Sequence, residues 1–337
     1  MSRLVTKIVC TLFIAVVLAP RANAEIIHAF DPAIGEFPES VATDRWGDVY
    51  VSLIRGAGEI RRFTRDGEME SFFQLDPPPP PDSQGILGLT TDGGGRIYAA
   101  VASFDPRTHG VWRIGRTGNG FRIPGTEAIV FPNDLVMDRH GFLYVTDTAQ
   151  GAVWRIGHNN GLGRPVELWA QDPLLLGDGS AGRPVPLGAN GIALGQQNLY
   201  VAVTEGARVV SIEIEPGPAR AAGEISVHVE HPDLFLIDGI TTDRDGRLFG
   251  AVVALNGMAL GRIMRIEPDA APQPVLGPED GLQMPTNLTF GTRGRDRNKL
   301  YVANWDAAAG ELGLTPMPAL HAFELEARGR PAMCPAP

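Results

Sequence analysis

The stretch NDLVMDRHGFLYVT, residues 133–146, decides the fold, because its pattern returns along the chain. An apolar run, an Asp-containing turn and a second run ending in Leu-Tyr-Val together predict a β-hairpin. Five further segments follow the same pattern: ESVATDRWGDVYVS (39–52), LGLTTDGGGRIYAA (87–100), NGIALGQQNLYVA (190–202), DGITTDRDGRLFGA (238–251) and NLTFGTRGRDRNKLYVA (287–303). Their aromatic residues, spaced 46 to 56 residues apart, are Tyr50, Tyr98, Tyr144, Tyr200, Phe249 and Tyr301.

A third strand follows most of these hairpins: EIRRF (59–63), VWRI (111–114), VWRI (153–156), RVVSI (208–212) and RIMRI (262–266). A period near 50 residues with three or four strands per repeat is typical of a β-propeller. Residues 25–337 hold six such repeats and no seventh, which predicts a single all-β domain, a six-bladed β-propeller. The last repeat lacks a fourth strand, so we expect EIIHAF (25–30) to complete that blade and close the ring, which removes open sheet edges.

The first 24 residues have the features of an export signal. Arg3 and Lys7 precede the uncharged run 8–19, and Ala22-Asn23-Ala24 offers a small-x-small cleavage site. The run is too short to span a bilayer, which takes roughly 20 helical residues. We therefore expect a signal peptide, residues 1–24, cleaved after Ala24, and a periplasmic or secreted protein with no membrane association; an uncleaved anchor is the alternative.

Composition narrows the classes of partner. The 39 acidic and 29 basic residues give a formal charge of −10, which disfavours binding to a phosphate backbone. The expected partner is a small-molecule substrate, not a nucleic acid, and the expected state is a monomer. Cys10 leaves with the signal, so Cys334 remains alone and no internal disulfide can form.

Polar residues recur where the first strand of each repeat begins. Counted back from the aromatic residue and adjusted for turn length, these positions are Glu39, Leu87, Asn133, Asn190, Asp238 and Asn287. The innermost strand of each propeller blade lines the central channel, so these side chains are expected to converge on the axis. Two carboxylates and three amides would then meet at one depth.

Buried carboxylates without a partner are costly, and two that lie close together repel each other. A divalent cation removes both costs. An all-oxygen set of this kind favours Ca²⁺, with Mg²⁺, Mn²⁺ and Zn²⁺ as alternatives; Zn²⁺ usually takes His or Cys, and neither occupies these positions. The sequence therefore predicts one divalent metal ion in the channel.

Several of these stretches also resemble one protein family. Glu39 with Asp44, PND (132–134), NG (190–191), DGITTDRDGRLF (238–249) and TNLTFG (286–291) resemble the senescence-marker-protein/gluconolactonase (regucalcin-like) family, over nearly the whole chain after the signal. The resemblance implies a six-bladed propeller that hydrolyses lactones or related esters at a divalent metal. It also implies that the metal ligands are Glu39, Asn133, Asn190 and Asp238, that Asp238 doubles as the catalytic acid/base, and that Asn287 is a more distant partner.

Two departures from the family pattern bear on the substrate. Glu39-Ser40-Val41 stands where the family has Glu-Gly-Pro. Phe131 stands two residues before Asn133, where the sugar lactonases have an Arg that holds substrate hydroxyls. A more apolar lactone or ester is therefore expected in place of a sugar lactone.

The predicted function is an exported, metal-dependent lactone or ester hydrolase, in which Asp238 takes a proton from water. Two alternatives stay open: a calcium-stabilised binding propeller without catalysis, and a strictosidine-synthase-like propeller. No G-x-S-x-G motif supports a serine hydrolase. His109 is either a solvated loop residue or reaches the channel mouth. The leucines at 174–176 either cap the substrate cavity or pack on the propeller rim.

Overall fold

The computed structural model describes residues 24–54, 58–157, 165–253 and 260–331. Within these ranges the chain forms 24 strands and seven short 3₁₀ helices, with no α-helix. No helix in the described ranges is long and apolar enough to cross a membrane. The expected signal segment lies outside the described residues apart from Ala24, where β1 begins.

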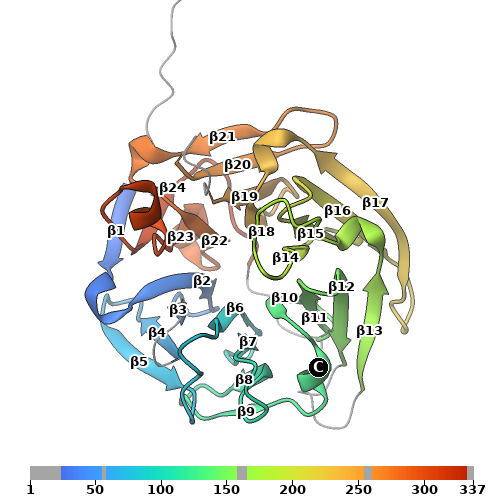
Figure 1. Ribbon diagram of the computed structural model, residues 1–337, viewed down its shortest axis with the longest axis horizontal. Helices are drawn as coiled ribbons and strands as arrows, with labels where there is room; N and C mark the ends of the chain where they lie inside the picture. The colour runs from blue at the N-terminus through green and yellow to red at the C-terminus, as the bar shows by residue number, and fades with distance from the viewer. Residues whose placement is uncertain (1–23, 55–57, 158–164, 254–259, 332–337) are drawn as a thin grey trace, which may run out of the picture.

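The strands form six antiparallel units of four, arranged around an axis (Figure 1). Blade 1 contains β2 (Phe37–Thr43), β3 (Val49–Ile54), β4 (Glu59–Phe63) and β5 (Met69–Gln74). Blade 2 contains β6 (Gly85–Thr91), β7 (Ile97–Ala102), β8 (Gly110–Ile114) and β9 (Gly120–Arg122). Blade 3 contains β10 (Pro132–Met137), β11 (Leu143–Asp147), β12 (Ala152–Ile156) and β13 (Val166–Gln171).

Blades 4 to 6 repeat the arrangement. Blade 4 contains β14 (Ala189–Leu194), β15 (Asn198–Val203), β16 (Arg208–Ile214) and β17 (Ala222–Glu230). Blade 5 contains β18 (Ile237–Thr242), β19 (Leu248–Val252), β20 (Arg262–Ile266) and β21 (Gln273–Leu276). Blade 6 contains β22 (Pro285–Phe290), β23 (Lys299–Asn304), β24 (Ala319–Glu324) and β1 (Ala24–Ala29).

The first strands of the blades form a closed ring around the axis. Five sheets are present, because one pair between Ile54 and Gly85 joins blades 1 and 2 into an eight-stranded sheet; each of the other four sheets is one blade. Neighbouring inner strands contact one another in the cyclic order β2, β6, β10, β14, β18, β22 and back to β2. The six-bladed propeller predicted from the repeats is confirmed.

The ring closes through the N-terminal strand, as the missing strand of the last repeat predicted. β1 pairs antiparallel with β24, with Glu25 opposite Ala322, and supplies the outermost strand of blade 6. Chain segments from opposite ends of the sequence thereby share one sheet. β1 thereby covers the outer edge of β24 and becomes the outermost strand of blade 6 itself.

The hydrophobic core lies between the blades. One cluster joins Val41 and Val51 of blade 1 to Tyr301 and Leu320 of blade 6, and similar clusters fill the other junctions. Each junction buries the inward faces of two sheets, so removing one blade would expose its neighbours. The aromatic residues of the repeats lie in these junctions, with Tyr144 fully buried.

The Asp residues of the repeats shape the hairpin turns, as expected. The Asp44 carboxylate accepts hydrogen bonds from the backbone N–H groups of Trp46, Gly47 and Asp48, at 2.8 to 3.0 Å. The corresponding carboxylates in three other blades accept turn N–H groups in the same way: Asp92, Asp138 and Asp243. Each carboxylate thus accepts hydrogen bonds from backbone N–H groups, most of which have no backbone partner in a tight turn.

The 3₁₀ helices lie in the connections: η1 (Pro32–Ile34), η2 (Thr126–Ala128), η3 (Pro173–Leu175), η4 (Pro232–Leu234), η5 (Pro278–Asp280), η6 (Gly294–Asn298) and η7 (Ala309–Leu312). Helix η3 decides the role of the leucines at 174–176. Leu175 is fully buried in the core between blades 3 and 4, and Leu174 packs against the same cluster. The leucines therefore anchor their loop on the rim, and only Leu176 is exposed.

Candidate metal centre at the channel mouth

Each inner strand carries a β-bulge at the end where the polar residues lie. In β2, Pro38 pairs with Leu53 and Val41 pairs with Val51, so two residues, Glu39 and Ser40, face Ser52 alone. The other five inner strands shift register at the same place. A bulge suspends the strict alternation of a strand, so two consecutive residues of each blade can approach the axis.

The bulges define two sets of equivalent positions, which we call the first ring and the second ring. The first ring consists of Glu39, Leu87, Asn133, Asn190, Asp238 and Thr286. The second ring consists of Ser40, Gly88, Asp134, Gly191, Gly239 and Asn287. Glycine is required at several second-ring positions because the blades approach closely there. A Cβ on Gly239 would lie 2.8 Å from the Asn287 side chain, and one on Gly191 would lie 2.2 Å from the Asp238 carbonyl oxygen.

The register corrects the expected position of Asn287. In β22, Pro285 pairs with Asn304 and Asn287 pairs with Ala303, which places Thr286 in the first ring and Asn287 in the second. The turn between β22 and β23 is longer than in the other blades, so counting back from Tyr301 gives a position one residue too late. Counting from the apolar residue that follows each bulge would have been correct, because Leu288 corresponds to Leu135.

Three carboxylates converge where the two rings meet. Glu39 and Asp134 are buried, and Asp238 retains a little contact with solvent in the channel. Burial and the nearby charges of Asp238 and Asp134 raise the pKa of Glu39 well above its usual range. Burial and the charge of Asp134 likewise raise the pKa of Asp238, which the Asn190 side chain partly offsets. These mutual effects place the three acids within electrostatic reach of one another.

Asp134 is the acid that strand periodicity missed. Its carboxylate accepts hydrogen bonds from the N–H groups of Leu135 and, in the next blade, Ile192, and burial raises its pKa to about 7. Alternation of side chains would turn Asp134 away from Asn133, and the bulge removes that restriction. The PND triplet is visible in the sequence, but strand alternation alone assigns its Asp134 to the face opposite Asn133.

Threonine hydroxyls orient the two first-ring amides of blades 3 and 4. Asn133 Nδ2 donates to Thr148 Oγ1 at 3.0 Å, and Thr148 Oγ1 in turn donates to the Ala189 carbonyl oxygen at 2.7 Å. In blade 4, Asn190 Nδ2 donates to Thr204 Oγ1 at 3.0 Å. One N–H of each amide is thus engaged, which fixes the orientation of the side chain and leaves its carbonyl oxygen for another partner.

The donor atoms fit a divalent cation. Glu39 Oε2 and Asn190 Oδ1 are buried and have no hydrogen-bond partner within the described part of the chain. Buried acceptors of this kind carry a large desolvation cost, and hard cations such as Ca²⁺ satisfy oxygen donors. No group of three or more His, Cys, Asp or Glu side chains in the described ranges is arranged to hold a metal. The set that fits combines the carboxylates of Glu39 and Asp238 with amide oxygens.

An apolar wall lies beside these donors. Ile54, Leu87 and Ala102 form a buried cluster, against which Phe37, Phe131 and Trp305 pack. Leu87 belongs to the first ring itself, and Phe131 lies two residues before Asn133. Trp305 connects this cluster to a second one around Met284, and its indole N–H is buried without a partner among the described residues. Phe131 therefore belongs to the wall that flanks the carboxylates.

His109 has a structural role behind this apolar wall. Its Nδ1 accepts the Phe104 N–H at 3.2 Å, so its Nε2 donates to the Ile129 carbonyl oxygen at 2.8 Å. The ring also stacks on Phe104, whose own ring contacts Phe131. Neither alternative expected for His109 is correct as stated, because the ring is buried and both nitrogens are occupied.

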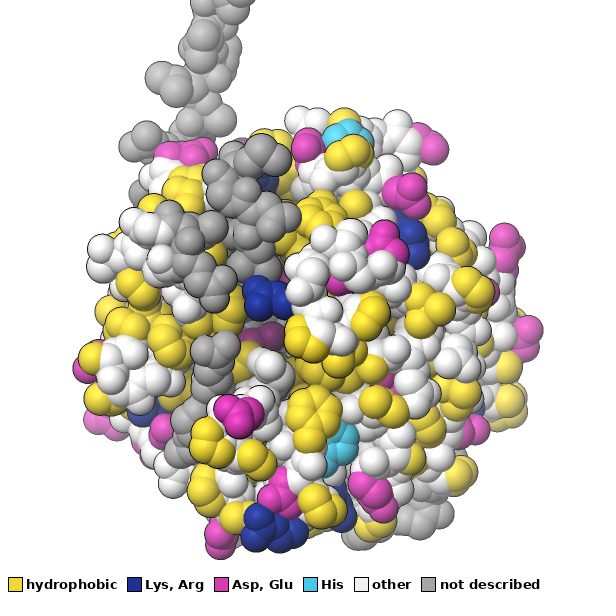
Figure 2. Space-filling view, in the orientation of Figure 1, with side chains coloured by type: hydrophobic (Ala, Val, Ile, Leu, Met, Phe, Trp, Pro, Cys, Tyr) yellow, Lys and Arg dark blue, Asp and Glu magenta, His cyan; other side chains and the backbone are white. Residues whose placement is uncertain are grey.

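The face that carries the loop before β14 is turned towards the viewer in Figure 1. Figure 2 shows a hollow near the centre of this face, with acidic atoms at depth, a basic side chain at its edge and hydrophobic side chains around it. The loop before β14 leads directly into Asn190. The first ring is therefore the end of the channel that this face exposes.

Comparison with known proteins gives structural matches only. No protein-family model matches the chain, and no curated protein matches it in sequence. A gluconolactonase from Xanthomonas campestris matches with a TM-score of 0.63 and 19% identity, over 90% of each chain. A luciferin-regenerating enzyme matches with a TM-score of 0.66 and 14% identity, over 93% of this chain and 99% of the other.

A third match is regucalcin from Agrobacterium tumefaciens, described as a calcium-binding protein, with a TM-score of 0.63 and 15% identity over 94% of this chain and 98% of the other. Identities this low establish the fold and leave activity to be argued from the site. The resemblance expected from the sequence is confirmed at that level: the chain has the propeller fold shared by the gluconolactonase, regucalcin and luciferin-regenerating enzyme of the senescence-marker-protein/gluconolactonase family.

Proposed function

We propose that this protein is a metal-dependent hydrolase of a lactone or related ester, acting at the first-ring end of the channel. The observation that carries the proposal is the convergence of Glu39, Asp134 and Asp238 with unsatisfied acceptors at Glu39 and Asn190. Uncompensated acids are costly to bury, and a bound cation would remove that cost. The gluconolactonases among the structural neighbours agree with this assignment.

The metal ligands in this proposal are Glu39, Asn133, Asn190 and Asp238, with Asn287 one ring further along the axis. A bound divalent cation supplies Lewis acidity to a substrate carbonyl and stabilises negative charge that develops on its oxygen. Ca²⁺ is the proposed ion, because all donors are oxygens, and Mg²⁺, Mn²⁺ and Zn²⁺ are the ions to compare with it.

Asp238 is the proposed base, which takes a proton from the attacking water. It keeps contact with the channel, whereas Glu39 is buried more completely, so Asp238 is the carboxylate that water can reach. Asn190 lies close to Asp238 and favours its ionised form, which a base requires. Glu39 acts only as a ligand in this scheme.

The change Asp238→Asn tests the assignment, because it keeps an oxygen donor and removes the base. We expect hydrolysis to fall by roughly 10²-fold or more while metal binding, followed by calorimetry, persists. Asp233→Asn is the matched control, since Asp233 lies in η4 with an exposed side chain. Near-normal turnover by a metal-loaded Asp238→Asn protein would reduce Asp238 to a ligand.

The apolar wall supports a substrate with a hydrocarbon substituent. Phe131 and Leu87 present apolar surface beside the donors, where a sugar would need hydrogen-bond partners. We expect Phe131→Ala to lower kcat/KM for an alkyl-substituted lactone by about tenfold, because burial of an aromatic ring contributes roughly 1.5–3 kcal/mol. Hydrolysis of unsubstituted γ-butyrolactone should change little. An equal loss on both lactones would indicate disruption of the site instead of loss of a substrate contact.

We also propose that the mature protein is exported as a monomer after cleavage behind Ala24. Mass spectrometry of the protein from its native host would identify the first residue.

If metal binds but no lactone or aryl ester in a broad panel is hydrolysed, the calcium-stabilised binding propeller becomes the better assignment.

A further inference from the structure

The channel contains a cavity on the far side of the second ring from the proposed metal ligands. It has a volume of 210 Å³, enough for about seven water molecules. Asp134 and Asn287 of the second ring line one end, and the later residues of the inner strands form the walls. None of the proposed metal ligands lines this cavity in the described part of the chain, whereas Asp134 borders both the cavity and the candidate metal centre.

Threonines dominate the polar lining, and they divide into two groups. Thr43, Thr91 and Thr242 donate their hydroxyls to backbone carbonyl oxygens of adjacent blades, at 2.8 to 2.9 Å. Thr292 donates likewise to the carbonyl oxygen of Asp44. These four hydroxyls join neighbouring blades and have no free hydrogen for a ligand.

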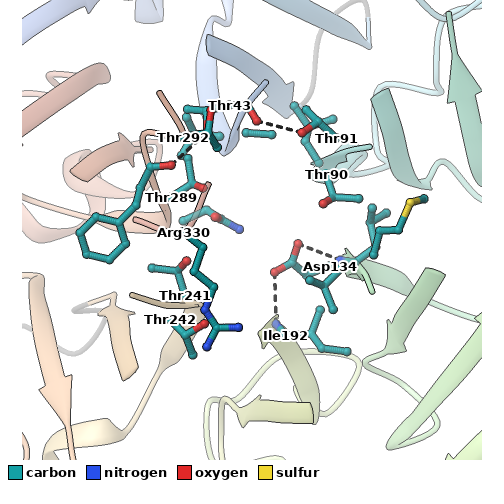
Figure 3. Close-up of a pocket in the computed structure, with 18 of the residues that line it drawn as sticks. Thr43, Thr90, Thr91, Asp134, Ile192, Thr241, Thr242, Thr289, Thr292 and Arg330 are labelled. Atoms are coloured by element: carbon teal, nitrogen blue, oxygen red, sulfur yellow. Dashed lines mark hydrogen bonds between the residues drawn. The ribbon is translucent and has the colours of Figure 1, made fainter. Parts of the chain in front are cut away.

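The other three threonines occupy equivalent positions in three blades. Thr90, Thr241 and Thr289 pair in register with the aromatic residue of their own blade, Tyr98, Phe249 and Tyr301 respectively. They therefore lie at the same depth along the channel. No hydrogen bond of their hydroxyls is found within the described ranges, and Figure 3 shows all three at the cavity wall.

Arg330 brings a cation to this cavity from the segment that follows β24. Backbone hydrogen bonds hold that segment across blades 5 and 6: Arg244 N–H donates to the Arg328 carbonyl oxygen, and Gly329 N–H donates to that of Arg297, each at 2.7 Å. Arg330 Nε donates to the Asp243 carbonyl oxygen at 3.1 Å and Nη1 to that of Gly195 at 3.4 Å. Its Nη2 has no partner, and no carboxylate pairs with Arg330 in the part of the chain that the structure describes.

The other charges at the cavity wall are already compensated. Asp92 pairs with Arg96, and Asp138 pairs with Arg220 at 2.8 Å. Among the described residues that line the cavity, Arg330 and Asp134 thus remain as the two charged groups without an ionic partner, and they lie on opposite sides of it (Figure 3). A ligand that suits both has a negative group at one end and hydrogen-bond donors at the other.

We propose that this cavity binds a small hydroxycarboxylate, with its carboxylate on Arg330 and its hydroxyl groups on the free threonines and Asp134. The guanidinium offers Nη2 to a carboxylate oxygen, in a partly buried setting where such a bond is stronger than in water. Thr90, Thr241 and Thr289 can each donate to and accept from ligand hydroxyls. Asp134 accepts from a hydroxyl group and repels a second carboxylate, which excludes dicarboxylates.

Calorimetric titration of the full chain tests this assignment with three probes: glycerate, propionate and glycerol. EDTA is present throughout, so that a metal at the first ring cannot hold the probe and failure here leaves the proposed hydrolase untouched. We expect glycerate to bind, propionate to bind at least about threefold more weakly because it lacks the hydroxyls, and glycerol not to bind.

Arg330→Gln should weaken glycerate binding by about tenfold or more, since it removes the charge and keeps an amide. Arg328→Gln is the matched control, because Arg328 Nε donates to Asn298 Oδ1 at 2.7 Å and does not line the cavity. If Arg330→Gln detaches the terminal segment, the double change Thr241→Val and Thr289→Val provides the independent test. It should abolish the preference for glycerate over propionate.

Four results would overturn the proposal. They are the absence of glycerate binding, unchanged binding by both variants, tighter binding of inorganic phosphate, and tighter binding of glycine, which would assign an ammonium group to Asp134.

Discussion

At the scale of single residues, the imidazole of His321 is buried without a hydrogen-bond partner in the part of the chain that the structure describes. His321 in β24 is 3% exposed, stacks on Phe323, and neither ring nitrogen has a partner among the described residues. Burial lowers its pKa from 6.5 to about 4. Between these two values the unfolded chain binds a proton that the folded chain does not, so the free energy of unfolding falls as the pH drops from 6.5 towards 4.

We expect this single group to reduce stability by about 2 kcal/mol at pH 5 relative to pH 7. His321→Leu removes the titration and keeps a similar volume, so its unfolding free energy should fall less across this interval. Urea unfolding of both proteins at pH 7 and pH 5 measures the difference directly. The raised pKa values of Glu39, Asp134 and Asp238 act in the opposite direction, but they do so equally in both proteins. The difference between the two pH profiles therefore reports on His321, and parallel profiles would show that His321 does not carry the effect.

At the scale of elements, β1 links the two ends of the chain into one ring. It pairs with β24, and His28 contacts the aromatic rings of Phe30 and Phe63, so β1 also reaches blade 1. Without β1, the edge of β24 would be free to pair with another molecule. The strand therefore stabilises blade 6 and covers the edge of β24.

Removing residues 24–29 should lower the unfolding free energy by roughly 3 kcal/mol or more, because a strand ladder and its apolar contacts are lost. The truncated protein should also form oligomers, visible by light scattering. A chain that begins at Glu25, the proposed mature N-terminus, is the control. Equal stability and a monodisperse truncated protein would show that the other blades hold the ring without β1.

At the scale of the whole molecule, the four proposed metal ligands come from four different blades. Glu39 belongs to blade 1, Asn133 to blade 3, Asn190 to blade 4 and Asp238 to blade 5. A cation bound by all four would hold these blades together, and only the folded ring can present them at once. Binding of such a cation would therefore be linked to global stability.

Calcium at 100 times its dissociation constant should raise the unfolding free energy by about 2.7 kcal/mol, and EDTA should reverse the gain. Differential scanning calorimetry with and without Ca²⁺ measures this shift. Glu39→Gln should reduce it, because the change leaves Asp238 as the one carboxylate among the four proposed ligands. A calcium-dependent shift of the same size in Glu39→Gln would place the ion elsewhere in the molecule.

Much of this architecture was determined by the sequence alone. The hairpin repeats, their Asp turns and the unpaired strand at the N-terminus follow from local patterns, since turn chemistry and strand periodicity involve neighbouring residues only. One hairpin pattern is weak evidence for a fold, but six copies at regular spacing predict a propeller. The convergence of Glu39, Asn133, Asn190 and Asp238 could be predicted because equivalent positions in a ring share one depth.

Only the tertiary structure decided the positions and roles of residues that depend on bulges and on long-range contacts. Asp134 joined the acids and Asn287 moved to the second ring because a bulge places two consecutive residues at the axis, which strand alternation cannot anticipate. The roles of His109 and Leu175 depended on partners distant in the sequence. Arg330 faces threonines of blades 2, 5 and 6 for the same reason: closing the ring places residues together that no local pattern relates.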